Sequence, residues 1–451
     1  MSEKQTDVLI IGSGTSAHYC AHGLRESGKR VTVADEREFG GTCALRGCQP
    51  KKYLVANAEA IAMASHLVGR GIVSNPVCDW PALQRLKNEF LDGIPEGTVK
   101  GFEAAGMDVL CGHARFIAEN TVQVGNDTVR AEHIVIATGS KPREAGIPGA
   151  KYAGTSDDFL NLPELPASIV FIGGGYISFE FAHVAVRAGV KATILHRSAH
   201  ALKAFDPDMV DIIVAASREA GIDVVLNEPA KAIEKDDGKF SVVGGSGKRY
   251  TADFVIEASG RVPNVSVLDG DLGRVESGPN GVVVNEFLQS VSNPLVYAIG
   301  DVAATRYQLA PVADCEGMIA ATNVARGNVE KMDYDGVASS VFTIPELATV
   351  GLSESAAKNH GLEYHVHKGT TEEWASSIRI GEKHAGYKIL FENGTHKILG
   401  AHLARHNASE VINVFALAIK FCMTMHDLES VTWAYPTYTS DLKKMIRHIY
   451  E

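Results

Sequence analysis

Long apolar runs are the feature that this sequence of 451 residues most clearly lacks. Its first apolar run, residues 8–11, reaches glycine after four residues, and no cationic stretch precedes it. A secretory signal peptide needs a longer apolar segment than this, and a membrane-spanning helix needs roughly 18 apolar residues. We therefore expect a cytoplasmic protein that has no membrane partner.

Positive charge is also in deficit. Lys and Arg together number 43 against 54 Asp and Glu, so the formal net charge is −11. Proteins that bind nucleic acid need a basic face for the phosphates, and this excess of acidic residues argues against that class. The hydrophobic content of 45% and the charged content of 22% are typical of a soluble globular protein. A chain of this length predicts about three domains.

Cysteine is scarce as well, with seven in the whole chain. In a reducing compartment cysteines stay thiols unless they work in catalysis or metal binding. Only Cys43 and Cys48 lie close enough to suggest a local pair, in the segment Gly-Gly-Thr-Cys-Ala-Leu-Arg-Gly-Cys-Gln-Pro-Lys-Lys of residues 40–52. A zinc site normally has a second ligand pair nearby, which is missing here. Two cysteines that pack as small hydrophobic residues would explain neither the glycines nor the Pro-Lys-Lys. Two thiols at this spacing can close a small disulfide ring if the local backbone allows it.

The N-terminal segment has the pattern of a dinucleotide-binding βαβ unit. A buried strand over 7–12, a helix over 14–24 and a strand over 30–35 are expected in turn. In the loop Gly-Ser-Gly-Thr-Ser-Ala that begins at Gly12, the first glycine permits the tight turn and Gly14 permits close approach to a pyrophosphate. Asp35 ends the second strand, where its carboxylate can bind ribose hydroxyls. We therefore predict a nucleotide site here and not a plain structural turn.

The same pattern returns in residues 168–196, where a second glycine-rich loop holds Gly173 and Gly175. Its second strand ends in His-Arg instead of an acid. A carboxylate there would repel a 2′-phosphate, whereas Arg197 and Lys203 can bind one. We predict that this loop binds NADPH; the alternative is that the two cations are only solvated surface residues.

The rest of the chain predicts how the domains are arranged. A helical region is expected over 51–106 and a strand over 133–137, and the Pro- and Gly-rich link 141–149 follows. A strand with Gly-Asp at its end occupies 295–301, and from 336 we expect an α+β tail of alternating strands and one helix over 409–423. These boundaries predict four segments, 1–147, 148–268, 269–335 and 336–451.

Together these motifs resemble the flavin disulfide reductase family, the group of glutathione reductase, dihydrolipoamide dehydrogenase and mercuric reductase. The Gly-Gly-Thr-Cys segment and the motif Val-Tyr-Ala-Ile-Gly-Asp of residues 296–301 carry the resemblance most strongly. The segments 137–139, 258–264 and 342–351 extend it over nearly the whole chain. The resemblance implies an α/β fold with two Rossmann-like domains and an α+β dimerisation domain. It also implies FAD and NADPH as cofactors. The four segments are then 1–147, FAD-binding domain (first part); 148–268, NADPH-binding domain; 269–335, FAD-binding domain (second part); and 336–451, dimerisation domain.

The resemblance also implies roles for individual residues. Cys43 is similar to the thiol that meets substrate, and Cys48 to the thiol that contacts the flavin; beside a flavin such a pair can accept two electrons and pass them on by thiolate exchange. Lys51 and Glu180 resemble the ion pair near flavin N5, and Tyr176 resembles the tyrosine that covers the nicotinamide pocket. The flavin contacts implied in addition are Thr42, Gly139, Arg261 and Asp301, with Asp301 at the ribityl chain.

Two departures from the family pattern concern the substrate. Tyr435 stands where the family has its acid–base histidine, and Ser440 stands where a glutamate orients that histidine. A tyrosine, with an ordinary pKa of about 10, is a poor base near neutral pH. The arginines that hold glutathione carboxylates are also missing, with Cys20 and Met318 at those places. The Tyr435 tail resembles that of mercuric reductases, but the terminal cysteine pair of those enzymes is absent.

The resemblance therefore implies an NADPH-dependent oxidoreductase in which electrons pass from NADPH to FAD, to the Cys43–Cys48 disulfide, and to an electrophile. We expect a soft metal ion, a metal–thiol complex, a disulfide other than glutathione or another small oxidant as substrate, and a homodimer with a shared active site. The alternatives are a glutathione- or lipoamide-type reductase with another acid, a flavin NADPH oxidase or quinone reductase, and a redox sensor.

Three weaker signals remain. His402 and His406 have a spacing that could bind a metal ion on a helix, but residues 397–403 predict a strand, so we expect packed or surface histidines and no metal site. Cys422 is expected on an apolar helix, with its side chain in the hydrophobic core. For Cys20, a core role and a role beside the substrate are equally open.

Overall fold

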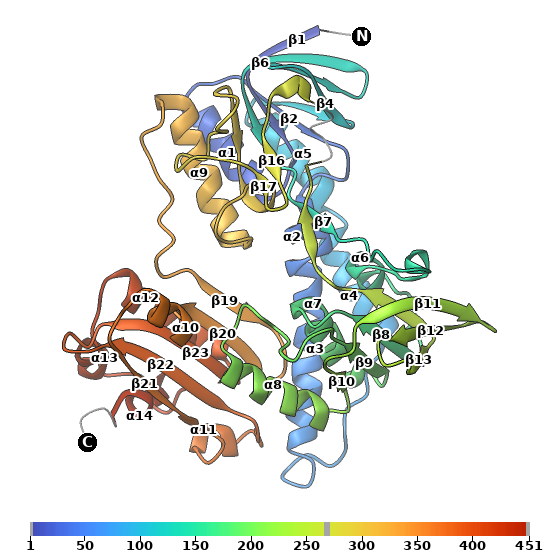
Figure 1. Cartoon of the computed structure of the whole chain (residues 1–451), viewed down its shortest axis with the longest axis vertical. Coiled ribbons are helices and arrows are strands. Elements are labelled where there is room, and N and C mark those ends of the chain that lie inside the picture. Colours follow the sequence, from blue (N-terminus) through green and yellow to red (C-terminus); the bar gives the residue numbers. More distant parts are fainter. Residues whose placement is uncertain (1–2, 266–270, 448–451) are drawn as a thin grey trace. The chain divides into compact units, whose positions relative to one another are not determined.

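The computed structural model describes residues 3–265 and 271–447 (Figure 1). Contacts within the chain divide it into two compact units. Unit 1 comprises Met1–Tyr53, Arg85–Arg143 and Gly260–Tyr334, and unit 2 comprises Leu54–Gln84, Glu144–Ser259 and Asp335–Glu451. Across the described ranges, no helix combines the length and the apolar character that crossing a membrane requires.

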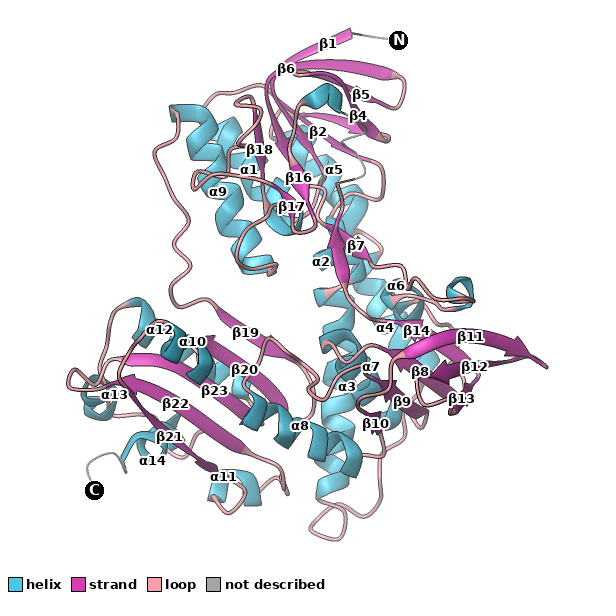
Figure 2. Cartoon of the chain, in the orientation of Figure 1, coloured by secondary structure: helices cyan, strands magenta, loops and turns pink. Residues whose placement is uncertain are grey.

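Unit 1 is built on a seven-stranded sheet with the order β3-β2-β1-β6-β5-β4, and β18 also pairs with β6 (Figure 2). The strands are β1 (Glu3–Ile11), β2 (Val31–Asp35), β3 (Asp108–Cys111), β4 (Ala114–Ala118), β5 (Thr121–Val124), β6 (Asp127–Ile136) and β18 (Val296–Ala298). Strands β1, β2, β3, β6 and β18 pair in parallel. The predicted strand over 7–12 is therefore present, but it begins at Glu3.

The core of unit 1 explains why β1 has a continuous apolar sequence. Val8 and Ile10 belong to a buried cluster on one side of the sheet, and Leu9 and Ile11 belong to another cluster. Because successive side chains of a strand point to opposite faces, a strand that is covered on both faces is apolar throughout.

The helices and short strands of this unit are α1 (Thr15–Glu26), α2 (Gly41–Arg46), α5 (Ile94–Ala104), α9 (Ala310–Arg326), β7 (Ser140–Pro142), β15 (Arg261–Pro263), β16 (Ser277–Gly278) and β17 (Gly281–Val282).

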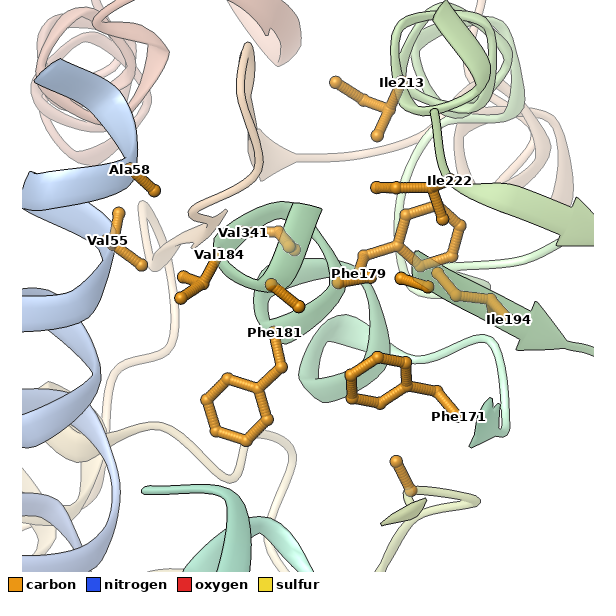
Figure 3. Close-up of a cluster of buried hydrophobic side chains, with 14 of the residues drawn as sticks. Val55, Ala58, Phe171, Phe179, Phe181, Val184, Ile194, Ile213, Ile222 and Val341 are labelled. Carbon is orange, nitrogen blue, oxygen red and sulfur yellow. The ribbon is translucent and has the colours of Figure 1, made fainter. Parts of the chain in front are cut away.

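The helical region expected over 51–106 is three separate helices with a long loop between the first two. They are α3 (Cys48–His66), α4 (Trp80–Leu91) and α5. Helix α3 begins in unit 1, and its later turns belong to unit 2. Figure 3 shows Val55 and Ala58 of α3 in the same buried cluster as Phe181 and Val184.

Unit 2 contains the second dinucleotide-type fold, a parallel sheet with the order β10-β9-β8-β14. Its elements are β8 (Ser168–Ile172), α7 (Tyr176–Arg187), β9 (Lys191–Leu195), α8 (Pro207–Glu219), β10 (Asp223–Val225) and β14 (Phe254–Glu257). An antiparallel sheet of β11 (Ala230–Asp236), β12 (Lys239–Gly244) and β13 (Arg249–Ala252) accompanies it, and α6 (Ser156–Leu160) precedes β8. Phe159 stacks on Phe181 with ring centroids 4.3 Å apart, and these aromatic side chains fill much of the core.

The tail of unit 2 is a five-stranded antiparallel sheet with the order β19-β20-β23-β22-β21. The strands are β19 (Ala338–Val341), β20 (Glu346–Gly351), β21 (Tyr364–Thr370), β22 (Gly386–Glu392) and β23 (Ile398–Arg405). The prediction of a single helix here was wrong. Besides α12 (Ala408–Lys420), the tail has α10 (Glu354–Asn359), α11 (Ala375–Ile378), α13 (Met425–Ser430) and α14 (Leu442–Ile446). These four have at most six residues each, too few to establish a helical period in the sequence.

The prediction that Cys422 lies on a helix and in the hydrophobic core was also wrong. It follows α12, is exposed, and has a positive φ of 52°. Cys20, in contrast, is fully buried in α1, and burial raises the pKa of its thiol to about 12, which favours the core role. His402 lies buried in β23 and contacts the Thr349 hydroxyl at 2.6 Å, as expected for a packed histidine. Among the residues that the structure describes, no three or more His, Cys, Asp and Glu side chains come together as the ligands of a metal ion.

A buried charge cluster ties the tail of unit 2 to α8. Lys388 of β22 has only 2% of its side chain exposed, and its Nζ donates to Asp206 at 2.8 Å and to Glu354 at 2.7 Å. Asp206 also caps α8, because its Oδ1 accepts from the backbone N–H of Asp208 at 3.0 Å. Removing one partner from such a buried cluster costs about 3–5 kcal/mol. The cluster therefore fixes the end of the loop that carries Arg197 and Lys203.

Candidate active site

The first glycine-rich loop of unit 1 has the geometry of a phosphate cradle. Gly12 has a φ of 113°, and a Cβ there would lie 2.2 Å from the carbonyl oxygen of Ala137, so only glycine fits. A Cβ at Gly14 would meet only the Cα of Gly41, at 3.8 Å. Helix α1 begins after Gly14 with neither a side-chain cap nor an acid in its first turn. Its free N–H groups therefore suit an anion such as a pyrophosphate.

The segment that carries the cysteine pair is tied to this loop. Gly41 has a φ of 72°, and a Cβ there would lie 2.4 Å from the Cα of Gly14. The N–H of Gly40 donates to the Ser13 hydroxyl at 3.1 Å, and that hydroxyl donates to Asp35 at 2.6 Å. Asp35 thus organises both loops in addition to the nucleotide role that we predicted for it. Thr42 follows directly and is exposed.

Cys43 and Cys48 lie on two successive helices. Cys43 is in α2, which ends at Gly47, and Cys48 is the first residue of α3. Both are thiols; Cys43 is partly buried and Cys48 is exposed. The hydrogen bond with the Cys48 thiol, followed by burial, raises the pKa of Cys43, while the positive charge of Lys51 opposes this rise. The structure therefore brings the two predicted redox thiols into direct contact.

The remaining predicted flavin residues of unit 1 form a connected group. Asp301 accepts a hydrogen bond from the Ser140 hydroxyl at 2.8 Å, and the Arg261 Nε donates to the same hydroxyl at 2.9 Å. Gly139 has a φ of 66° and open space where a Cβ would be. Sequence reasoning missed Glu316, a fully buried acid of α9 that accepts from the Gly300 N–H at 2.7 Å; burial raises its pKa. It holds the Gly-Asp turn in place. No sequence motif links Glu316 to that turn, so it could not be predicted from the sequence.

The second glycine-rich loop, in unit 2, shows why His196 replaces an acid. A Cβ at Gly173 would lie 2.4 Å from the Ala258 carbonyl oxygen, and one at Gly174 would lie 2.5 Å from the His196 ring. The buried His196 therefore packs directly beneath the loop. Helix α7 begins after Gly175 without a side-chain cap and without an acid in its first turn, as α1 does. Both helix N-termini are suited to nucleotide phosphates.

Arg197 and Lys203 lie beside this second loop. Both are exposed, and their positive charges help to lower the pKa of His196, although burial is the main cause. The N–H of Leu202 donates to the Gly174 carbonyl oxygen at 2.8 Å. This hydrogen bond folds the segment that carries both cations against the glycine-rich loop.

Three of the predicted catalytic residues are divided between the two units. Lys51 lies in the first turn of α3 in unit 1. In unit 2, Glu180 is buried in α7 and accepts from the Phe342 N–H at 2.9 Å. Tyr176 begins the same helix and is 49% exposed. Within its own unit, each side chain occupies the expected element.

Tyr435 has little contact with the rest of its own chain. It is 85% exposed, and its hydroxyl has no hydrogen-bond partner among the described residues. Ser440 does not orient it, since the Ser440 hydroxyl accepts from the Thr437 N–H at 3.1 Å and stays within a local turn. The two substitutions thus remove both the imidazole and the group that would orient it.

Two family models cover most of the chain. The pyridine nucleotide-disulphide oxidoreductase model matches residues 6–317, and the dimerisation domain model of the same group matches residues 337–446. The chain therefore belongs to the pyridine nucleotide-disulphide oxidoreductases, which confirms the resemblance and the fold class predicted from the sequence. This family is FAD-dependent and takes electrons from a pyridine nucleotide.

Individual relatives span several activities. The chain is 30% identical over 442 residues to a glutathione reductase of Burkholderia cepacia, covering 98% of each chain. It is 32% identical over 445 residues to a mercuric reductase of Staphylococcus aureus, covering 97% of this chain and 81% of that one. It is also 30% identical over 440 residues to a dihydrolipoyl dehydrogenase of Chlamydia muridarum, covering 96% and 94%.

Among solved structures, the chain is similar to the HOCl-induced flavoprotein disulfide reductase RclA of Escherichia coli. Its Cu(II) complex superposes with a TM-score of 0.89 at 26% identity, covering 99% of this chain and 100% of that one. A second structure of RclA, whose description names no copper, gives a TM-score of 0.88 at 26% identity, covering 98% of this chain and 100% of that one. The sequence identity to relatives of different activity is nearly the same, so it does not indicate the substrate, which has to be argued from the site.

Proposed function

We propose that this protein is an NADPH-dependent FAD oxidoreductase in which Cys43 and Cys48 alternate between dithiol and disulfide. The observation that carries the proposal is the contact between these two thiols beside the α1 phosphate cradle. We retain the four segments predicted above as the domain assignment, and we propose a homodimer that shares its active sites. The coarser assignment, to the FAD-dependent disulfide oxidoreductases, does not depend on these details.

The proposed cofactor sites use the residues of each cradle. The N-terminus of α1 with Gly12, Gly14 and Asp35 would hold the nucleotide part of FAD, and Asp301 its ribityl chain. The N-terminus of α7 with Gly173 and Gly175 would hold NADPH. FAD, when bound, would supply the two-electron chemistry that links the nicotinamide to the Cys43–Cys48 disulfide. Lys51 and Glu180 are proposed as an ion pair near flavin N5, and Tyr176 as the cover of the nicotinamide pocket.

The dithiol half of the reaction belongs to the protein's own residues. With a disulfide substrate, the Cys43 thiolate attacks one sulfur and the first thiol leaves. The Cys48 thiolate then attacks the Cys43 sulfur, so the second thiol leaves and the Cys43–Cys48 disulfide forms. The substrate gains two electrons and two protons, and the dithiol loses two electrons and two protons as it becomes a disulfide.

For the substrate, we propose a soft metal ion, a small-thiol complex of such an ion, or a disulfide other than glutathione. Tyr435 in place of histidine supports this choice because a phenol is a poor base near neutral pH. The names of two relatives, a mercuric reductase and a Cu(II) complex of RclA, are consistent with it. A flavin NADPH oxidase or quinone reductase with idle thiols is the competing function.

Anaerobic reduction by one equivalent of NADPH tests the role of the dithiol. We expect a broad long-wavelength absorption band, because a Cys48 thiolate then contacts oxidised flavin. Cys48→Ser should abolish the band, whereas Cys43→Ser should show it even without reductant, since the Cys48 thiol is then permanently free. If both variants match the unmodified protein, the dithiol is not the electron carrier and the proposal is wrong.

Nucleotide preference tests Arg197 and Lys203. Each charged hydrogen bond to the 2′-phosphate contributes about 1.5–3 kcal/mol, or roughly ten- to 150-fold in affinity. We expect kcat/KM for NADPH to exceed that for NADH by such a factor, and Arg197→Ala to remove most of the difference by lowering the NADPH value. Lys231→Ala, which removes an exposed cation of β11, serves as the control. Equal kcat/KM values for the two nucleotides in the unmodified protein would contradict the assignment.

A further inference from the structure

Asp314 of α9 is a charged side chain beside the proposed active site to which the function above gives no role. It is partly exposed and accepts a hydrogen bond from the Thr15 hydroxyl at the start of α1. Helices α1 and α9 lie side by side (Figure 1). All of these residues belong to unit 1.

The backbone places this carboxylate near Cys43. Gly41 approaches Gly14 so closely that a Cβ on either one would meet the Cα of the other, at 2.4 Å and 3.8 Å. Thr15 follows Gly14, and Cys43 lies two positions after Gly41. The Thr15–Asp314 hydrogen bond then holds the carboxylate within electrostatic range of the thiol. The negative charge of Asp314 is accordingly among the causes that raise the pKa of Cys43, after the Cys48 hydrogen bond and burial.

No cation neutralises Asp314 directly. Among the described residues, neither Lys nor Arg forms an ion pair with it. On α1, the charge of Asp314 acts on His18 and by itself would raise its pKa. His18 packs against His22 with ring centroids 4.5 Å apart. Burial and then the charge of His22 lower the pKa of His18, so the imidazole is mostly neutral near pH 7. Lys51 adds a positive charge on the α3 side of Cys43.

We propose that Asp314 is a specificity-determining residue whose carboxylate favours cationic and neutral electrophiles at Cys43 over anionic ones. This inference deepens the proposed function and takes from it the role of Cys43 as the attacking thiol. It identifies metal cations and uncharged or cationic disulfides as the preferred substrate class. Anionic disulfides are disfavoured even if they fit, because a fixed negative charge within electrostatic range of the sulfur repels them.

Alkylation of Cys43 by reagents of different charge tests this without knowledge of the substrate. In both reactions the Cys43 thiolate displaces iodide from carbon, but iodoacetate is anionic and iodoacetamide is neutral. The NADPH-reduced holoenzyme is treated with each reagent under anaerobic conditions, and Cys43 modification is followed by peptide mass spectrometry. The ratio of the two rate constants cancels any change in the thiolate fraction.

Asp314→Asn should raise the iodoacetate-to-iodoacetamide ratio roughly three- to tenfold, the size expected for one unit charge near a partly solvated site. Asp314→Glu retains the charge and should keep the original ratio. Asp108→Asn removes a matched exposed charge at the amino end of β3 and should leave the ratio unchanged. An unchanged ratio in Asp314→Asn, or an equal rise in Asp108→Asn, overturns the proposal.

The unmodified protein provides a second measurement in case Asp314→Asn does not fold. Raising the ionic strength from 0.01 M to 0.5 M screens the carboxylate, so the ratio should rise toward its value with free cysteine. A ratio that salt does not change overturns the proposal. The proposed function fails separately, if turnover proves independent of Cys43, and the alkylation ratio can still be measured in that case.

Discussion

Cys43→Ser is expected to lower turnover with every dithiol-dependent acceptor by roughly 10⁴–10⁶-fold, the loss usual for a removed nucleophile. A serine hydroxyl is a weak nucleophile near neutral pH, whereas the sulfur of a cysteine is strongly nucleophilic even when only a small fraction is thiolate. The measurement is anaerobic NADPH consumption with disulfides, soft-metal–thiol complexes and quinones as acceptors. Reduction of the flavin by NADPH should be unaffected, because that step precedes the dithiol.

Cys422→Ser is the control, since Cys422 is an exposed thiol that lies in the tail of unit 2. It should leave turnover unchanged. If Cys43→Ser retains turnover with quinones or oxygen only, the protein is a flavin oxidase or quinone reductase and its thiols are idle. If it retains turnover with every acceptor, the dithiol mechanism is wrong.

Glutathione disulfide is expected to be a poor substrate of the unmodified protein, by about 10²–10⁴-fold relative to an enzyme with a positioned acid–base. The histidine that would protonate the leaving thiol is replaced by Tyr435, and Ser440 forms a local turn instead of orienting that position. The negative charge of Asp314 adds to the loss if the inference above holds. The measurement is kcat/KM with glutathione disulfide and NADPH.

We further propose that Tyr435 reaches the Cys43 pocket of the partner subunit, as a phenol donor or a metal contact. Its 85% exposure leaves it available for such a contact. Tyr435→Phe should lower turnover with metal–thiol substrates at least about tenfold, less than the roughly 10²–10⁴-fold of a fully positioned acid–base, and leave NADPH reduction of the flavin unchanged. Tyr152→Phe, which alters a partly buried tyrosine elsewhere in unit 2, is the control.

A kcat/KM for glutathione disulfide near the roughly 10⁶ M⁻¹s⁻¹ middle of the enzyme range would contradict the prediction that Tyr435 and Ser440 make this disulfide a poor substrate.

The paired βαβ folds were predictable because their signals are local. The run Val8–Ile11 is apolar at successive positions, which requires cover on both faces of the sheet, and Gly12 occupies a turn that excludes any Cβ. Strand ends were predicted within a few residues, since hydrogen-bonded pairing extends beyond the apolar core, as at the start of β1. The short helices of the tail were missed because they have less than two turns.

The amino-acid sequence by itself determined the family, the fold class, both glycine-rich loops and the spacing of Cys43 and Cys48. The family follows from the resemblance of motifs, whereas the other features depend on residues that are neighbours in the chain, so periodicity and backbone restrictions are enough to encode them. It also identified Tyr435 as a departure, since that needs only a residue type at a known place in a motif.

Only the tertiary structure decided which distant residues meet. The approach of Gly41 to Gly14, the buried Glu316 beneath Gly300 and the nearness of Asp314 to Cys43 all join segments far apart in the chain. Cys20 and Cys422 show the same limit, because the sequence left the role of Cys20 open and placed Cys422 in the core, whereas the structure buries Cys20 and exposes Cys422. Local periodicity predicts that one face of a helix or strand is buried. Which element buries that face, and which charged side chain lies next to it, depend on packing between elements.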